Sequence, residues 1–87
     1  MNLIIKENKD GVIKEVINLN NITNIFVTDG AKKEYNGDII YDICAVTTAK
    51  THISLIGFKD KQMCFSTLTD IVKTIKNEDM DVHITVE

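Results

Sequence analysis

Arginine, proline and tryptophan are absent from this 87-residue chain, and all ten of its basic side chains are lysines. Aspartate and glutamate number 13, which gives a net charge of −3. Arginine is the usual donor of bidentate contacts to phosphate and guanine, so its absence argues against direct binding of DNA or RNA. Lysine can still hold a phosphate as a point charge, which leaves a small nucleotide open as a ligand. Without proline, no predicted strand edge is protected by that residue.

Long apolar runs are also lacking. No stretch approaches the roughly 20 apolar residues that a membrane helix needs, and the start, MNLIIKENKD, is too short in its apolar part for a signal peptide. We therefore expect no membrane association and a cytoplasmic protein, with thiols that stay reduced. The length predicts a single domain over residues 1–87, with one small core.

Cysteine and histidine are scarce, with two of each. Two cysteines and two histidines are the ligand count of a structural zinc site, but such sites draw their ligands in close pairs. Here the spacing is Cys44-x7-His52-x11-Cys64-x18-His83, without a close pair. Cysteine in apolar surroundings is more often a small core residue. We expect no metal and no other cofactor.

Catalytic motifs are missing as well. Cys44 and His52 could form a thiolate–imidazole pair, but an apolar strand leaves a thiol unreactive. Neither Ser54 nor Ser66 lies in a G-x-S-x-G elbow, and no Walker loop or G-x-G-x-x-G occurs. The expectation is that the protein is not an enzyme.

Isoleucine, valine and threonine are abundant, whereas leucine and alanine are few. This β-branched composition favours a sheet with few helices. A turn at Asn8-Lys9-Asp10-Gly11 separates the first two predicted strands, and the third ends at Asp29-Gly30, before a polar loop, AKKEYNGD. The predicted strands cover about 2–7, 12–18, 21–29, 39–46, 51–58 and 81–87.

One helix is predicted over about 61–77, with Asp60 as its N-cap, while Thr67 with Asp70 offers a later capping box if the helix is shorter. Its apolar stripe comprises Cys64, Leu68, Ile71 and Ile75, widened by Phe65 and Val72. The predicted fold is therefore α+β, an antiparallel sheet of five to six strands with this amphipathic helix packed on one face and a short C-terminal strand.

The two central strands predict an uncovered surface. Strand 39–46 is apolar on both faces, and strand 51–58 places Ile53 and Leu55 on one side and Ile56 and Phe58 on the other. One helix covers one face, so the second face needs the N-terminal hairpin or another subunit as its cover. A half-barrel that closes on itself is the alternative. We expect self-association, as a homodimer or a larger oligomer, since unprotected edges also allow strand addition or swapping.

The runs NLNNITNIFVTD, YDICAV and LIGFKDKQMCFSTLTDIV resemble small low-GC bacterial and phage proteins of unassigned function. The resemblance covers most of residues 18–75. It consists of a strand that ends near Gly57 and Phe58, then a helix with a small residue at Cys64 and aliphatics at Leu68 and Ile71. These are packing positions, so the resemblance implies a fold and no catalytic group. The abundance of Ile, Lys and Asn, which have A/T-rich codons, agrees with a low-GC genome.

Function is expected to be non-enzymatic binding. The first hypothesis is a phage or mobile-element accessory protein that binds and inhibits or sequesters a host defence factor in the host cytoplasm. The second is an oligomeric sponge for a small signalling nucleotide, and the third is a small bacterial regulatory or structural subunit. Loops 29–38 and 47–51 are the expected contact regions. The candidate ligand- or partner-binding residues are Lys32, Lys33, Tyr35, Lys50, Phe58 and Lys59.

Overall fold

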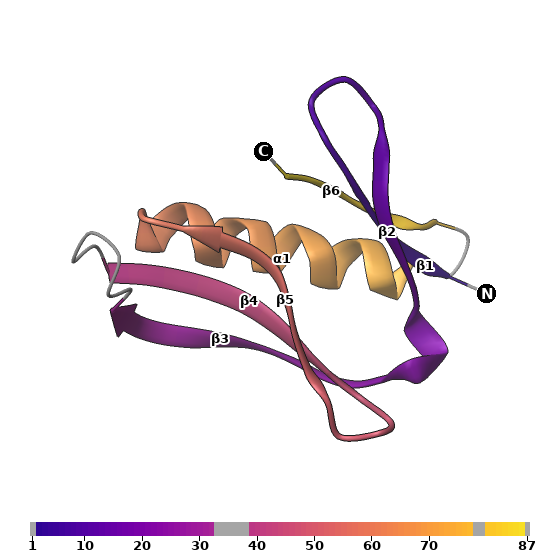
Figure 1. Ribbon diagram of the computed structural model, residues 1–87, viewed down its shortest axis with the longest axis horizontal. Helices are drawn as coiled ribbons and strands as arrows, with labels where there is room; N and C mark the ends of the chain where they lie inside the picture. Colours follow the sequence, from indigo (N-terminus) through magenta and orange to yellow (C-terminus); the bar gives the residue numbers. More distant parts are fainter. Residues whose placement is uncertain (1, 33–38, 78–79, 87) are drawn as a thin grey trace.

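The computed structural model describes residues 2–32, 39–77 and 80–86, and for residues 29–32 it describes the main chain only. The fold is α+β, with one α-helix and two three-stranded sheets in the described part of the chain (Figure 1). The strand orders are β2-β1-β6 and β3-β4-β5.

The first sheet joins both ends of the chain. Strands β1 (Leu3–Glu7) and β2 (Ile13–Asn18) form an antiparallel hairpin, and β6 (Val82–Thr85) pairs parallel to β1 on its other side. Gly11 takes a φ of 81° in the hairpin turn, which the Asp-Gly signal predicted. The Asn8 Oδ1 accepts from the main-chain N–H groups of Asp10 and Val12, each at 2.9 Å, and so holds the turn.

The second sheet is antiparallel throughout. It contains β3 (Ile22–Lys32), β4 (Ile39–Thr47) and β5 (His52–Phe58). The turn between β4 and β5 places Lys50 at a φ of 63°. The predicted end of β3 at Asp29-Gly30 is wrong, because the strand continues to Lys32 across a register shift between Thr28 and Ala31.

Helix α1 (Lys61–Lys76) confirms the predicted helix and its cap. The Asp60 Oδ1 accepts from the N–H groups of Gln62 at 2.8 Å and Met63 at 3.4 Å. The predicted stripe was too wide, since Phe65 and Val72 are 41% and 40% exposed. A single sheet face beneath a helix contacts a narrow strip of it, and that strip centres on the buried Cys64 and Ile71.

The core lies between α1 and both sheets. Figure 1 shows β5 crossing in front of α1, with β4 and β3 below the helix and the β1–β2 hairpin to one side. Ile4 and Val82 of the first sheet share one buried cluster with Ile43 of β4 and Ile71 of α1. The hairpin therefore packs on the same side of β4 as the helix. The buried cluster comprises Ile4, Ile43, Ala45, Leu55, Cys64, Ile71, Val82 and Ile84.

The prediction of one sheet with five to six strands is wrong. A 3-10 turn, η1 (Leu19–Asn21), separates β2 from β3, with the Asn18 side chain accepting from the Asn20 N–H. This turn redirects the chain, so β2 and β3 belong to different sheets. The last strand then joins β1 in a parallel pair, which buries Val82 and Ile84 beside Ile4.

The predicted faces of β5 are also wrong. A register shift opposite Ile43 and Cys44 leaves Leu55 between the paired residues Ser54 and Ile56. Ile53, Ile56 and Phe58 therefore pair with residues of the helix-facing side of β4, and all pack against the core. The face of β5 away from α1 therefore carries fewer apolar side chains than the alternating sequence pattern predicted.

Candidate functional site

The four candidate zinc ligands lie apart. Cys64 is fully buried beneath β4, where its Sγ lies 3.4 Å from the carbonyl oxygen of Tyr41. Cys44 points to the opposite face of that strand, because it neighbours the helix-facing Ile43 and Ala45. Neither cysteine forms a disulfide. Across the described ranges, no three His, Cys, Asp or Glu side chains gather where they could hold a metal ion.

The two histidines make different contacts. The His52 ring meets the Phe26 ring edge-on, with 5.7 Å between centroids, on the face of the β3-β4-β5 sheet that α1 does not cover. His83 lies in the other sheet, where its Nδ1 is 2.9 Å from the Glu7 Oε1. Both rings thus have a local packing or hydrogen-bonding role.

The predicted nucleotide-binding residues fall at two separate places. Lys50 lies in the turn before β5, whereas Phe58 ends β5 and Lys59 follows it. Seven strand residues span roughly 20 Å, so Lys50 does not share a site with the other two. Lys32 ends β3, at the same end of the sheet as Phe58. Lys33 and Tyr35 lie outside the described residues.

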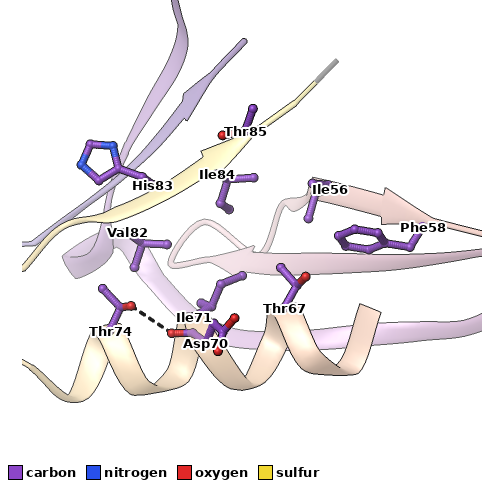
Figure 2. A pocket seen from close by; sticks show the side chains of 10 residues that line it. All are labelled: Ile56, Phe58, Thr67, Asp70, Ile71, Thr74, Val82, His83, Ile84 and Thr85. Atoms are coloured by element: carbon purple, nitrogen blue, oxygen red, sulfur yellow. Dashed lines mark hydrogen bonds between the residues drawn. The ribbon is translucent and has the colours of Figure 1, made fainter. Parts of the chain in front are cut away.

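A hollow of about 300 Å³ lies between β6, the second half of β5 and one side of α1 (Figure 2). A second hollow of about 440 Å³ shares Ile56 and Phe58 with the first and extends it to Met63 and Val86. We call the two together the β5–β6 groove. Its first part is lined by Ile56, Phe58, Thr67, Asp70, Ile71, Thr74, Val82, His83, Ile84 and Thr85.

Among the described strands, β6 pairs on one side only, with β1, and its other edge runs along this groove. In Figure 2, Val82 and Ile84 point toward α1, whereas His83 and Thr85 point to the other face of their strand. Since residues of both faces line the hollow, the strand borders it with its edge.

The hydrogen-bond pattern identifies the main-chain groups on that edge. The Val86 N–H donates to the Glu7 carbonyl oxygen at 2.7 Å. The main-chain N–H and C=O groups of the even-numbered residues in this segment therefore point to β1. Successive residues of a strand direct their main-chain groups to opposite edges. The N–H and C=O groups of His83 and Thr85 therefore point away from β1, toward the groove.

Asp70 supplies a carboxylate to the groove wall. It lies on α1 between Thr67 and Thr74, and its main-chain oxygen accepts from the Thr74 hydroxyl at 2.9 Å. Within the described part of the chain, the Asp70 carboxylate has no hydrogen bond or ion pair. The remaining groove lining is mainly aliphatic and aromatic side chains and threonine hydroxyls.

A second exposed apolar surface lies on the hairpin. Val12, Ile13 and Val16 are each more than half exposed. Ile13 and Val16 are opposite Glu7 and Ile5, on the side of the sheet away from the core. We call these three residues the hairpin patch. Strand β2 is also an edge of its sheet.

The far face of the β3-β4-β5 sheet carries Phe26, Cys44 and Val46, and none of the described elements packs on it (Figure 1). Phe26 and Val46 are half-buried, and Cys44 is 9% exposed. The N-terminal hairpin, one of the two covers expected from the sequence, does not cover this face.

Comparisons with protein-family models, curated proteins and solved structures found no match to this chain. None of the described helices is both long and apolar enough to cross a membrane. Sequence reasoning missed the β5–β6 groove. The alternation of DVHITVE signalled a half-exposed strand, but the position of its free edge depends on its parallel pairing with β1.

Proposed function

We propose that this protein is a small non-enzymatic binding protein that holds an extended segment of another protein in the β5–β6 groove. The observation that carries the proposal is the unpaired edge of β6 along a groove with apolar walls. A strand added to this edge gains main-chain hydrogen bonds from His83 and Thr85. Its side chains on one face then enter the groove beside Ile56, Phe58 and Ile71.

The inhibitor hypothesis is a more specific form of this proposal. In it, a phage or mobile-element accessory protein sequesters a host defence factor by occupying one of the factor's extended segments. The resemblance to small low-GC bacterial and phage proteins and the acidic composition support it. A bacterial regulatory subunit that uses the same groove is the chromosomal counterpart.

The non-enzymatic part of the proposal rests on the placement of the reactive side chains. The His52 ring packs against Phe26, and Cys44 is buried, with 9% of its surface exposed. His83 lines the groove, and its ring is engaged with Glu7. The groove itself offers one carboxylate and threonine hydroxyls, which suit recognition better than nucleophilic catalysis.

A nucleotide sponge is the second candidate, because Phe58 lines the groove and Lys59 follows it directly. In this case Phe58 would stack on the base and Lys59 would contact a phosphate. A thermal-shift screen with cyclic and linear nucleotides tests it, since a ligand of the native state raises the melting temperature. A rise that Phe58→Ala abolishes would favour the sponge over peptide binding.

Self-association remains part of the proposal, through the open edge of β2 and the hairpin patch. Exposed apolar patches of this kind often mark contacts between subunits. The mass in solution of the wild type and of Ile13→Lys tests this expectation. An oligomer that the substitution dissociates supports the hairpin as the interface, and a monomeric wild type contradicts it.

The peptide-binding proposal is tested by selecting displayed random decapeptides on the immobilised protein. Binding of the enriched peptides is then measured to Thr85→Pro, to Thr85→Val and to Val16→Pro. Proline at 85 removes a groove-facing N–H and leaves the pairing of β6 with β1 intact. Val16→Pro is the control, because it removes an outward-facing N–H from the free edge of β2 and leaves the pairing of β2 with β1 intact. We expect binding to be lost in Thr85→Pro alone. Absence of enriched peptides, or equal binding by all variants, would contradict the proposal.

A further inference from the structure

We infer that the segment bound in the β5–β6 groove carries a lysine or arginine side chain that pairs with Asp70. This inference rests on the proposed function and adds the chemical class of its partner. It makes Asp70 the residue that determines specificity in the groove.

The charge distribution of the groove supports this inference. The ionisable residues among those that line it are Asp70 and His83. His83 directs its ring to the outer face of its sheet, where its Nδ1 meets the Glu7 Oε1 (Figure 2). Asp70 comes from α1, and its carboxylate forms no ion pair in the described part of the molecule. The groove therefore presents one uncompensated negative charge to an occupant.

Asp70 is exposed to solvent. A segment that lies over α1 removes water from this carboxylate, and an unpaired carboxylate is costly to desolvate. An apolar side chain above Asp70 leaves that cost uncompensated, whereas an ammonium or guanidinium group offsets it with a charge-assisted hydrogen bond. Asp70 thus favours basic segments and disfavours wholly apolar ones.

The two ends of the groove differ, which gives the partner a pattern. Asp70 and Thr74 line the first hollow, whereas Met63 and Val86 line the continuation beyond Phe58. Side chains two positions apart on a strand point to the same side. The bound segment therefore has a basic residue over Asp70 and an apolar residue on the same face of the strand, an even number of positions away, beside Phe58.

The test repeats the decapeptide selection on the wild type and on Asp70→Asn, with Asp10→Ser as a control that removes a carboxylate at the hairpin tip. We expect wild-type and Asp10→Ser pools with a basic residue at one position and an apolar residue an even number of positions away. The Asp70→Asn pool should lose the basic residue and keep the apolar one. Replacing the selected lysine by norleucine should weaken binding to the wild type roughly tenfold, and binding to Asp70→Asn much less.

The outcomes separate the two proposals. Peptides that bind in the groove, as judged by loss of binding in Thr85→Pro, but show no basic preference would overturn the role of Asp70 and leave the groove intact. A basic preference that persists in Asp70→Asn would overturn it too. Failure to enrich any peptide would overturn both proposals. Melting temperatures of all variants, measured alongside, confirm that each protein is folded.

Discussion

The Lys6 Nζ donates a hydrogen bond to the main-chain oxygen of Ser54 at 3.1 Å and so connects the two sheets. The same ammonium group lies 3.6 Å from the Glu15 Oε1 across the hairpin. The Lys6 side chain is 17% exposed, so most of its aliphatic stem is covered. Ser54 lies two residues before Ile56, the first residue of β5 that lines the groove. The contact therefore fixes β5 relative to β1 just before the groove begins.

Removing the amine of Lys6 should loosen the contact between the sheets. Lys6→Met keeps an apolar stem but leaves the Ser54 oxygen without its donor, and we expect a loss of about 0.5–1.5 kcal/mol in the free energy of unfolding. Urea denaturation measures this loss. Lys14→Met is the matched control on the exposed side of the same hairpin, and its effect should stay within about 0.5 kcal/mol. Equal effects of the two substitutions would show that the contact adds nothing to stability.

Neighbouring positions of α1 should differ sharply in their contribution to stability. Ile71 is 3% exposed in the core, whereas Val72 is 40% exposed. Ile71→Ala should reduce the free energy of unfolding by about 2–5 kcal/mol, since it leaves a cavity among residues of both sheets. Val72→Ala should cost less than about 1 kcal/mol. Comparable losses in denaturation experiments would mean that the helix packs with another face.

Removing the N-cap of α1 should lower the free energy of unfolding less than Ile71→Ala does. Asp60→Ala removes the acceptor of the Gln62 and Met63 N–H groups, and we expect a loss of about 1 kcal/mol. Asp60→Asn retains an acceptor oxygen and should preserve most of the stability. Thermal unfolding of the two variants tests the cap, and an alanine variant as stable as wild type is inconsistent with it.

Gly57 is constrained by its neighbour across the sheet. It pairs with Asp42, and a Cβ atom at Gly57 would collide with the Asp42 carboxylate and lie 3.1 Å from the Ile40 Cγ2. Gly57→Ala should therefore lower the free energy of unfolding by about 1–3 kcal/mol. In the Asp42→Ala background the same change should cost less, which a double-mutant cycle measures. An identical cost in both backgrounds would exclude the carboxylate as the cause.

Local signals predicted much of this fold. The Asp10-Gly11 turn, the Asp60 cap and the helical spacing of Cys64 and Ile71 each depend on residues a few positions apart, and all three are confirmed. The division into two sheets was not predictable in this way. It depends on the pairing of β6 with β1, which brings Val82 beside Ile4 from opposite ends of the chain.

The candidate site was harder still to predict. Alternation along β5 gave the wrong faces, because Leu55 sits at a bulge and shifts the register that follows it. The sequence pattern places Asp70 on the exposed side of a helix. That Asp70 lines a groove follows only from the position of β6 beside α1. Phe58 was a candidate for stacking on a base and does line the groove, but as one wall of a longer, mostly apolar surface.

Amide hydrogen exchange of His83 and Thr85 tests the central claim most directly. Both N–H groups point away from β1, so without a partner they should exchange faster than the paired amides of Ile84 and Val86. On addition of a selected decapeptide, exchange at His83 and Thr85 should slow by roughly tenfold or more, because added-strand hydrogen bonds protect them. The amide of Val16 on the β2 edge should not change. Unchanged exchange at His83 and Thr85 in the peptide-bound protein, or protection at Val16 instead, would contradict the groove as the binding site.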